Sequence, residues 1–190
     1  MTKQEIIDRL KTGNENFVKN KLVHENQDGE RKSSLVGGQK PFAIILSCAD
    51  SRVVPELAFD AGLGELFVVR VAGNVANTSS IASMEYAVAN LGTSVIVVLG
   101  HESCGAVTAA VQGGDNGYNL NHLLAHIAPA ISRASDSSNV DEVIRVNAKL
   151  TVDDLINRSA IIGDAVKSGN VQIIPAYYHL DSGSVEFLNS

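Results

Sequence analysis

Apolar residues fall along the chain in two patterns, short continuous runs and stripes at helical spacing. Continuous runs of strand length occupy residues 42–46, 66–69 and 95–99, and such runs are typical of parallel strands that are buried on both faces. Between the last two runs, apolar residues over 81–91 share one helical face and stop at Gly92, as in a helix that ends at a glycine. This pattern predicts a strand, helix, strand unit.

The N-terminal part of the chain shows a helical stripe followed by a polar stretch. Thr2 and Glu5 fit a capping box, and apolar residues from Ile6 to Val18 recur at helical spacing, which predicts an amphipathic helix. The stretch over residues 24–40 is polar, and we expect it to be a solvated loop.

The C-terminal half is expected to be mostly helical. Helices are predicted to start near Cys104, to span residues 120–131 and to cover about 140–166. Two short apolar runs, 171–178 and 184–188, flank a turn, which predicts a hairpin at the sheet edge. We therefore expect an α/β fold, with a mainly parallel β-sheet flanked by helices, an N-terminal helical arm and a C-terminal edge hairpin.

Length and composition fit a single folded domain. The chain has 190 residues, of which 45% are hydrophobic and 19% are charged, as is typical of a globular protein with its own core. We expect one domain over residues 1–190, with a helical arm and loop in 1–40 and the α/β core in 41–190.

Charge and hydropathy argue against several classes of partner. The net charge is −6 and the basic residues are scattered, whereas nucleic acid binding usually needs a concentrated basic face. No apolar run approaches the roughly 20 residues of a transmembrane helix, so we expect no membrane association. Residues 1–20 mix acids and bases and lack the apolar segment of a secretory signal, and we expect a cytoplasmic protein.

Candidate chemistry gathers where two of the predicted strands end. Cys48 follows the first predicted strand, and His101 and Cys104 follow the third. The carboxyl ends of neighbouring parallel strands meet at one edge of a sheet, so these side chains are expected to lie together. Thiolate and imidazole donors suit zinc, and a site with three protein ligands leaves a position for water, as catalytic zinc sites do. We predict one Zn²⁺ per chain at Cys48, His101 and Cys104.

From these residues alone, other interpretations stay open. A free cysteine is often a small buried hydrophobic residue, and a lone histidine is usually a surface or core residue. Cys48 and Cys104 are the two cysteines of the chain, and they could also form a disulfide or a redox-active thiol pair. Metal content and a thiol count distinguish these possibilities from a zinc site.

Asp50 and Arg52 lie in the same segment as Cys48 and can form a charge-assisted pair. The pair could be a simple surface ion pair. Beside zinc it gains a catalytic role, because an ionised Asp50 can accept the hydrogen bond of a metal-bound water while Arg52 keeps the carboxylate charged and oriented. Two thiolate ligands make the metal a weaker acid than three imidazoles would, so activity is expected to rise with pH.

The segments that carry these residues resemble the β-class carbonic anhydrases. The matching motifs are CADSR from Cys48, FVVRVAGN from Phe67, MEYAV from Met84 and HESCGAV from His101. The resemblance covers essentially the whole chain, with the motifs in the expected order. It implies a zinc enzyme that reversibly hydrates carbon dioxide to bicarbonate and a proton.

The resemblance also assigns roles and a quaternary structure. It implies that Cys48, His101 and Cys104 are the zinc ligands and that Asp50 and Arg52 are the catalytic pair. It further implies self-association as a homodimer or a dimer of dimers, in which the N-terminal helix contacts the partner chain.

Among the positions at which the chain departs from some members of this family, two bear on ligand binding. Members that bicarbonate locks in an inactive state resemble one another in a tryptophan where this chain has Ile45, and Arg70 and Tyr178 would complete that pocket. We therefore predict an enzyme without this switch. Ala61 stands where many bacterial members have a glutamine that helps to hold the substrate.

Two alternative functions stay open. The same site could hydrolyse carbon disulfide or carbonyl sulfide, or the chain could be a zinc-binding or redox-responsive protein without turnover, since exposed thiolates oxidise readily. His122 and His126, four residues apart, are interpreted as a solvated surface pair rather than as proton shuttles.

Overall fold

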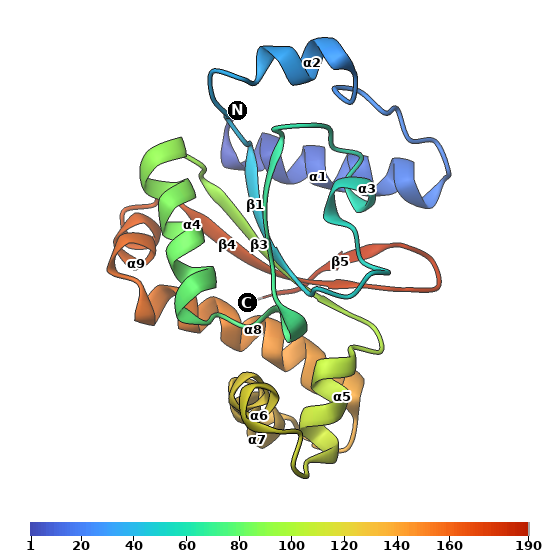
Figure 1. Cartoon of the computed structure of the whole chain (residues 1–190), viewed down its shortest axis with the longest axis vertical. Helices are drawn as coiled ribbons and strands as arrows, with labels where there is room; N and C mark the ends of the chain where they lie inside the picture. The colour runs from blue at the N-terminus through green and yellow to red at the C-terminus, as the bar shows by residue number, and fades with distance from the viewer. Residues whose placement is uncertain (190) are drawn as a thin grey trace.

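A five-stranded sheet forms the centre of the molecule, which a computed structural model describes over residues 1–189 (Figure 1). Its strand order is β2, β1, β3, β4, β5; the first four of these are parallel, and β5 pairs antiparallel with β4. The predicted α/β fold with a mainly parallel sheet and an edge hairpin is confirmed. The strands are β1 (Ala43–Ser47), β2 (Leu66–Arg70), β3 (Val95–His101), β4 (Gln172–Tyr178) and β5 (Val185–Phe187).

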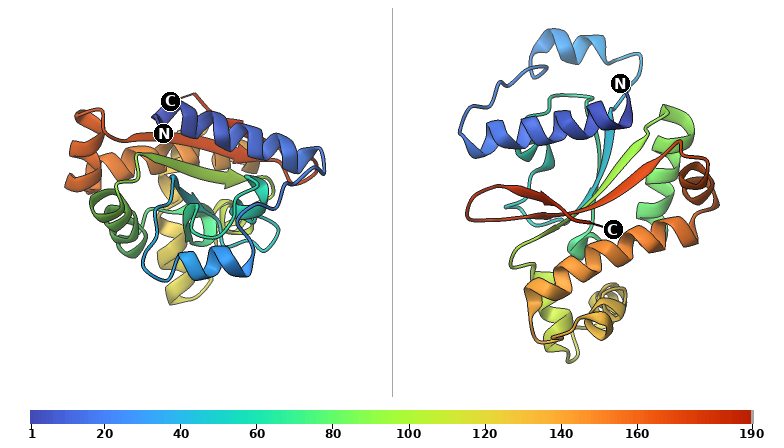
Figure 2. Two further views of the ribbon diagram at one scale, coloured as in Figure 1. Left: turned by 90° about the horizontal axis from the view of Figure 1, so that it is seen from above. Right: turned by 180° about the vertical axis from the view of Figure 1, so that it is seen from behind.

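Helices cover both faces of the sheet, which explains the continuous apolar runs of the strands. In β1, Ala43 and Ile45 pack with α1 and α3 on one face, whereas Ile44 and Leu46 pack with α4, α8 and α9 on the other. Figure 2 shows α1 running across the sheet near the amino end of β1. The helices are α1 (Lys3–Val18), α2 (Gly29–Ser34), α3 (Pro55–Ala58), α4 (Thr78–Leu91), α5 (Gly105–Gln112), α6 (Tyr118–Ala125), α7 (Ala128–Arg133), α8 (Val140–Arg158) and α9 (Ala160–Lys167), and a 3₁₀ turn, η1, spans Ala72–Asn74.

Helix α1 has the predicted capping box. The Thr2 side chain accepts a hydrogen bond from the Glu5 N–H, and the Glu5 carboxylate accepts one from the Thr2 N–H. Ile6, Ile7 and Leu10 are buried against the chain's own sheet. The helix therefore belongs to the core of this chain, and its contact with a partner chain stays a prediction.

Asn14 ties α1 to the hairpin and to α3. The residue is 6% exposed, and its Nδ2 donates to the carbonyl oxygens of Ala58 and Gly183, at 3.0 and 2.8 Å. Its Oδ1 accepts from the N–H of Val185 at 2.8 Å. One side chain thus satisfies three backbone groups from two segments that lie far apart in the sequence.

Replacing Asn14 with Ala is expected to lower the free energy of unfolding by about 2–5 kcal/mol, because each buried group left unpaired costs about 1–3 kcal/mol. Urea denaturation measures this change. Gln4→Ala, on the exposed side of the same helix, should change it by less than about 0.5 kcal/mol. Equal stability of the two variants would contradict the anchoring role of Asn14.

Two helices predicted as single elements are each divided, so both predictions are wrong on this point. The helix expected over residues 120–131 is α6 followed by α7, because Pro129, at the start of α7, has no N–H to continue the bonding pattern of α6. The helix expected over 140–166 is α8 followed by α9. The backbone of Ser159 is extended between them, and its hydroxyl accepts from the Ile162 N–H.

The structure also contains short elements that the sequence pattern does not predict. The stretch over residues 24–40 is largely exposed, as expected, but it includes α2, where the Asp28 carboxylate accepts from the Arg31 N–H at 2.7 Å. The expectation of a loop throughout is therefore wrong. Helix α3 and the turn η1 each span about one turn, which is too short to show an apolar period.

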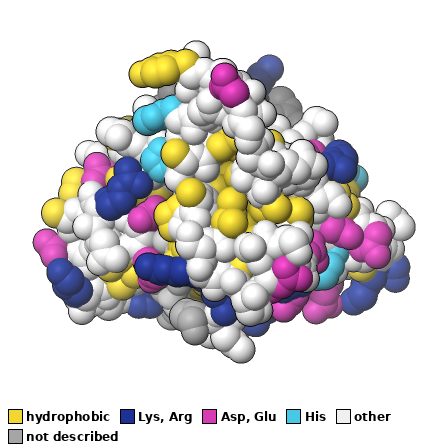
Figure 3. Space-filling model, turned by 90° about the horizontal axis from the view of Figure 1, so that it is seen from below, with side chains coloured by type: hydrophobic (Ala, Val, Ile, Leu, Met, Phe, Trp, Pro, Cys, Tyr) yellow, Lys and Arg dark blue, Asp and Glu magenta, His cyan; other side chains and the backbone are white. Residues whose placement is uncertain are grey.

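Helices α5, α6 and α7 gather beyond the carboxyl ends of the strands, at the bottom of Figure 1. Seen from that end, hydrophobic side chains lie near the middle of the face and charged ones lie towards its edges (Figure 3). A cavity between these helices is lined by residues that include Ala109, Ala110 and Ile131. Among the helices of residues 1–189, none combines the length and apolar character that crossing a membrane requires.

Candidate metal centre

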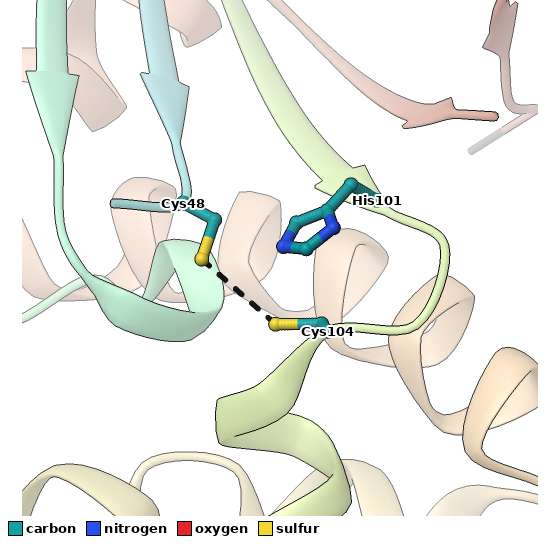
Figure 4. A group of neighbouring side chains, drawn as sticks. All are labelled: Cys48, His101 and Cys104. Carbon is teal, nitrogen blue, oxygen red and sulfur yellow. Dashed lines mark hydrogen bonds between the residues drawn. The ribbon is translucent and has the colours of Figure 1, made fainter. Parts of the chain in front are cut away.

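Three donor side chains meet at the carboxyl end of the sheet (Figure 4). Cys48 directly follows β1, His101 is the last residue of β3, and Cys104 is the N-cap of α5. One donor atom from each residue lies within 4.8 Å of the others. Both cysteines are free, with their Sγ atoms 3.9 Å apart. The strand ends thus bring together the three residues that the sequence analysis singled out.

The imidazole of His101 is fully buried, and the backbone sets its orientation. Its Nδ1 lies 2.8 Å from the carbonyl oxygen of Glu102, so we place the proton on Nδ1, which leaves a free lone pair on Nε2. Within residues 1–189, Nε2 is buried without a hydrogen-bond partner. Buried polar atoms are rarely left unpaired, and a metal ion between this nitrogen and the two sulfurs would satisfy it.

The surroundings of the two thiols favour negative charge on Cys48 rather than on Cys104. The hydrogen bond with Cys104 lowers the pKa of Cys48 to about 4, and the N–H of Gly73, 3.4 Å from its Sγ, acts in the same direction. The same hydrogen bond and burial raise the pKa of Cys104. The shared hydrogen bond therefore favours a thiolate at Cys48 and a thiol at Cys104, and metal binding would displace the remaining thiol proton.

This donor set fits zinc. Two sulfurs and one imidazole nitrogen are ligands that zinc prefers, and three protein ligands leave one tetrahedral position for water. The carbonyl of Glu102 orients the imidazole of His101 from behind, as partners of metal-binding histidines usually do. The amino end of α5, which carries partial positive charge, lies at Cys104 and favours its thiolate form.

Asp50 and Arg52 form the predicted ion pair beside the three donors. Arg52 Nε donates to Asp50 Oδ1 at 2.9 Å and Arg52 Nη2 donates to Oδ2 at 2.7 Å, which fixes the plane of the carboxylate. These bonds from Arg52 hold the pKa of Asp50 well below its usual range. Asp50 Oδ2 lies 3.9 Å from Nε2 of His101. An ionised, oriented carboxylate thus stands next to the candidate metal position.

Arg70, the last residue of β2, holds the segment that carries Cys48 and Asp50. Its Nε donates to the carbonyl of Cys48 at 3.0 Å, and its Nη2 donates to the carbonyl of Asp50 at 2.6 Å. Ile45 and Tyr178, the other two positions of the bicarbonate pocket considered above, pack in the apolar cluster under α1. The absence of a bicarbonate switch stays a prediction.

Arg70→Met is expected to weaken zinc binding by about 10-fold, since loss of such outer contacts typically costs 10–100-fold. It should also lower the stability of the metal-free protein by about 1–2 kcal/mol, because two hydrogen bonds are lost at a partly exposed position. Competition with a chromophoric chelator and urea denaturation measure the two effects. Arg133→Met, at an exposed position on α7, is the control; equal zinc affinity of the two variants would contradict a role for Arg70.

Other residues weighed in the sequence analysis lie in separate cavities. Ala61 lines one that includes none of the three donors. His122 and His126 meet edge to face, with ring centres 5.7 Å apart, and line another together with Arg158. The candidate chemistry therefore rests on the three donors and on the ion pair of Asp50 and Arg52, without Ala61 or the two histidines.

Gly73 and Asn147 also contact the donor group, directly or through one another, and no role is predicted for them from the sequence. Gly73 presents its N–H to Cys48, and Asn147, on α8, donates from Nδ2 to the Gly73 carbonyl at 2.9 Å. Asparagine within an apolar helix face is a signal that could have pointed to this contact, because a buried amide needs a partner. Which partner it takes depends on the tertiary structure.

Known proteins resemble this chain in sequence and in structure. The profile of a family described as carbonic anhydrase matches residues 43–185. Carbonic anhydrase 2 of Mycobacterium tuberculosis is 41% identical over 180 residues, which cover 92% of this chain and 87% of that protein. The carbonic anhydrase of Mycolicibacterium smegmatis is 40% identical over 183 residues, with coverage of 93% and 89%. A tetrameric β-carbonic anhydrase from Sordaria macrospora has the same fold, with a TM-score of 0.76 at 24% identity over 84% of this chain and 86% of that chain.

Proposed function

The chain belongs to the β-class carbonic anhydrases, and from this premise we propose that it catalyses the zinc-dependent, reversible hydration of carbon dioxide to bicarbonate and a proton. The observation that carries the proposal is the buried group of Cys48, His101 and Cys104 beside an ionised carboxylate. Relatives that are 40–41% identical over most of the chain are named carbonic anhydrases, which supports the same substrate.

We assign one Zn²⁺ per chain to Cys48, His101 and Cys104. Support comes from the unpartnered Nε2 of His101 and from the two free thiols next to it. Bound zinc would lower the pKa of a coordinated water from about 15.7 towards about 7 and so supply a nucleophile near neutral pH. Two thiolates donate more charge than imidazoles would, so the rate is expected to increase as the pH rises above neutrality.

Asp50 and Arg52 are assigned as the catalytic pair. The carboxylate can accept a hydrogen bond from the attacking water and thereby fix the direction of its lone pair. The two bonds from Arg52 keep Asp50 charged and turned towards the guanidinium. A carboxylate released from Arg52 could itself bind a metal held by the three donors, so the ion pair would also leave that metal open to water.

We propose that the chain works as a homodimer or a dimer of dimers. The Sordaria macrospora relative is tetrameric. Tyr86 on α4 is 51% exposed, and its ring centre lies 6.5 Å from that of Phe67 on the edge strand β2. Exposed aromatic side chains of this kind are enriched in subunit interfaces. Sedimentation equilibrium would show a dimer or larger, whereas a monomer at micromolar concentration would overturn this part.

Stopped-flow measurement of carbon dioxide hydration tests the proposed activity. Zinc-loaded protein should hydrate carbon dioxide, with a rate that rises between about pH 7 and 9, and metal-free protein should not. Carbon disulfide and carbonyl sulfide serve as the alternative substrates. Hydrolysis of either without hydration of carbon dioxide would overturn the proposal, as would zinc binding without any turnover.

A further inference from the structure

Asn147 places a buried amide on the mainly apolar face of α8. The residue is 3% exposed, and its buried neighbours on the helix include Val143, Ile144 and Ala148. Burying an amide costs free energy unless it is hydrogen-bonded. The Nδ2 of Asn147 donates one bond, to the carbonyl oxygen of Gly73 at 2.9 Å, so the amide acts on the turn that contains Gly73.

Gly73 has a backbone conformation that other residues rarely adopt. Its φ is +70°, and a Cβ at this position would lie 2.9 Å from Cδ1 of Ile127. Glycine has the widest conformational freedom of all residues, so an outside contact is needed to hold it in one conformation. The bond from Asn147 is such a contact.

The conformation of Gly73 decides where its N–H points. In the structure this N–H donates to Sγ of Cys48 at 3.4 Å. Cys48 is itself 4% exposed. Figure 4 shows the turn after β2 passing directly beside Cys48. A chain of two hydrogen bonds therefore runs from α8, through one glycine, to a sulfur of the donor group.

We propose that Asn147 is a positioning residue for the metal centre, which fixes the carbonyl of Gly73 and thereby keeps the N–H of Gly73 directed at the sulfur of Cys48. The inference rests on the function proposed above, because it takes Cys48 as a metal ligand. A hydrogen bond to a ligand sulfur restrains its position and stabilises its negative charge. Outer partners of metal ligands typically contribute about 10–100-fold to metal affinity.

The test compares Asn147→Leu with Thr151→Val. Thr151 is 3% exposed on the same face of α8, so its variant removes a buried polar group without touching Gly73. Competition with a chromophoric chelator should show zinc affinity about 10–100-fold weaker in Asn147→Leu and unchanged in Thr151→Val. With Co²⁺ in place of zinc, the sulfur-to-cobalt absorption should shift in Asn147→Leu alone.

A second variant covers the case in which Asn147→Leu does not fold. Asn147→Ser should also weaken zinc binding and shift the cobalt absorption, because the serine side chain is one bond shorter than that of asparagine and its hydroxyl lies farther from the Gly73 carbonyl. Unchanged zinc affinity and an unchanged cobalt spectrum in either folded variant, even with a lower melting temperature, would overturn the positioning role. If the unaltered protein binds zinc but does not hydrate carbon dioxide, the proposed function is overturned. The zinc affinities of the variants then still decide whether Asn147 positions the metal centre. Unaltered protein that binds no zinc would overturn both.

Discussion

Replacing Cys48 with Ser is expected to remove zinc from the protein and to abolish carbon dioxide hydration. A neutral hydroxyl is a much weaker zinc ligand than a thiolate, and Cys48 supplies one of the three donors of the site. The loss of affinity should exceed the roughly 10–100-fold that removal of an outer partner typically costs. Metal analysis of the purified variant and a stopped-flow assay measure the two effects.

Ser51→Ala is the matched control, since Ser51 lies in the same segment but is exposed. It should keep one zinc per chain and its hydration rate. Cys104→Ser should behave as Cys48→Ser does, because each sulfur belongs to the same donor group. Normal zinc content in Cys48→Ser would contradict the assignment of Cys48 as a ligand.

Asp50→Asn is expected to keep zinc but to lower kcat/KM by about 10²–10⁴-fold, the range typical for loss of a general acid or base. The amide has the shape of the carboxylate but no charge, so it cannot form the two-point ion pair with Arg52. Zinc content equal to that of the unaltered chain would separate this effect from loss of the metal. A rate within a few-fold of the unaltered protein would contradict a catalytic role for Asp50.

The dependence of stability on pH tests the same pair independently. Hydrogen bonds from Arg52 lower the pKa of Asp50, so the stabilisation from the ionised carboxylate is complete above the ordinary aspartate pKa and is lost as the pH falls through the lowered one. In Arg52→Met the folded-state pKa of Asp50 should return towards its ordinary value of 3.8, so this stabilisation should be largely absent and the free energy of unfolding should shift to a weaker dependence on pH in the acid range. The free energy of unfolding of metal-free protein below about pH 6 measures the shift. Lys149→Met, at an exposed position on α8, should show no such shift. Identical curves of unfolding free energy against pH for the two variants would contradict the pairing of Asp50 with Arg52.

The strands could be predicted because burial on both faces requires continuous apolar runs, and such runs are visible in the sequence. The break between α8 and α9 could not, because apolar residues continue across it. It depends on the side-chain cap of Ser159 and on Gly163, where a Cβ would lie 2.5 Å from the carbonyl oxygen of Ile156. Contacts of this kind exist only after the chain has folded back on itself.

The candidate site likewise has one part that could be predicted from the sequence and one part that could not. Cys48, His101 and Cys104 follow predicted strands, so the rule that parallel strands end at one edge was enough to group them. Gly73 and Asn147 reach Cys48 through backbone groups, from a turn and a helix that lie far apart in the sequence. A backbone contact leaves no periodic signal, so only the structure reveals it.

Zinc K-edge X-ray absorption of the zinc-loaded protein tests the central claim most directly. Zinc held by Cys48, His101 and Cys104 predicts two sulfur neighbours at about 2.3 Å and nitrogen or oxygen neighbours at about 2.0–2.1 Å. A shell of nitrogen and oxygen alone would contradict the claim, as would protein that retains no zinc and shows a disulfide between Cys48 and Cys104 in place of two free thiols.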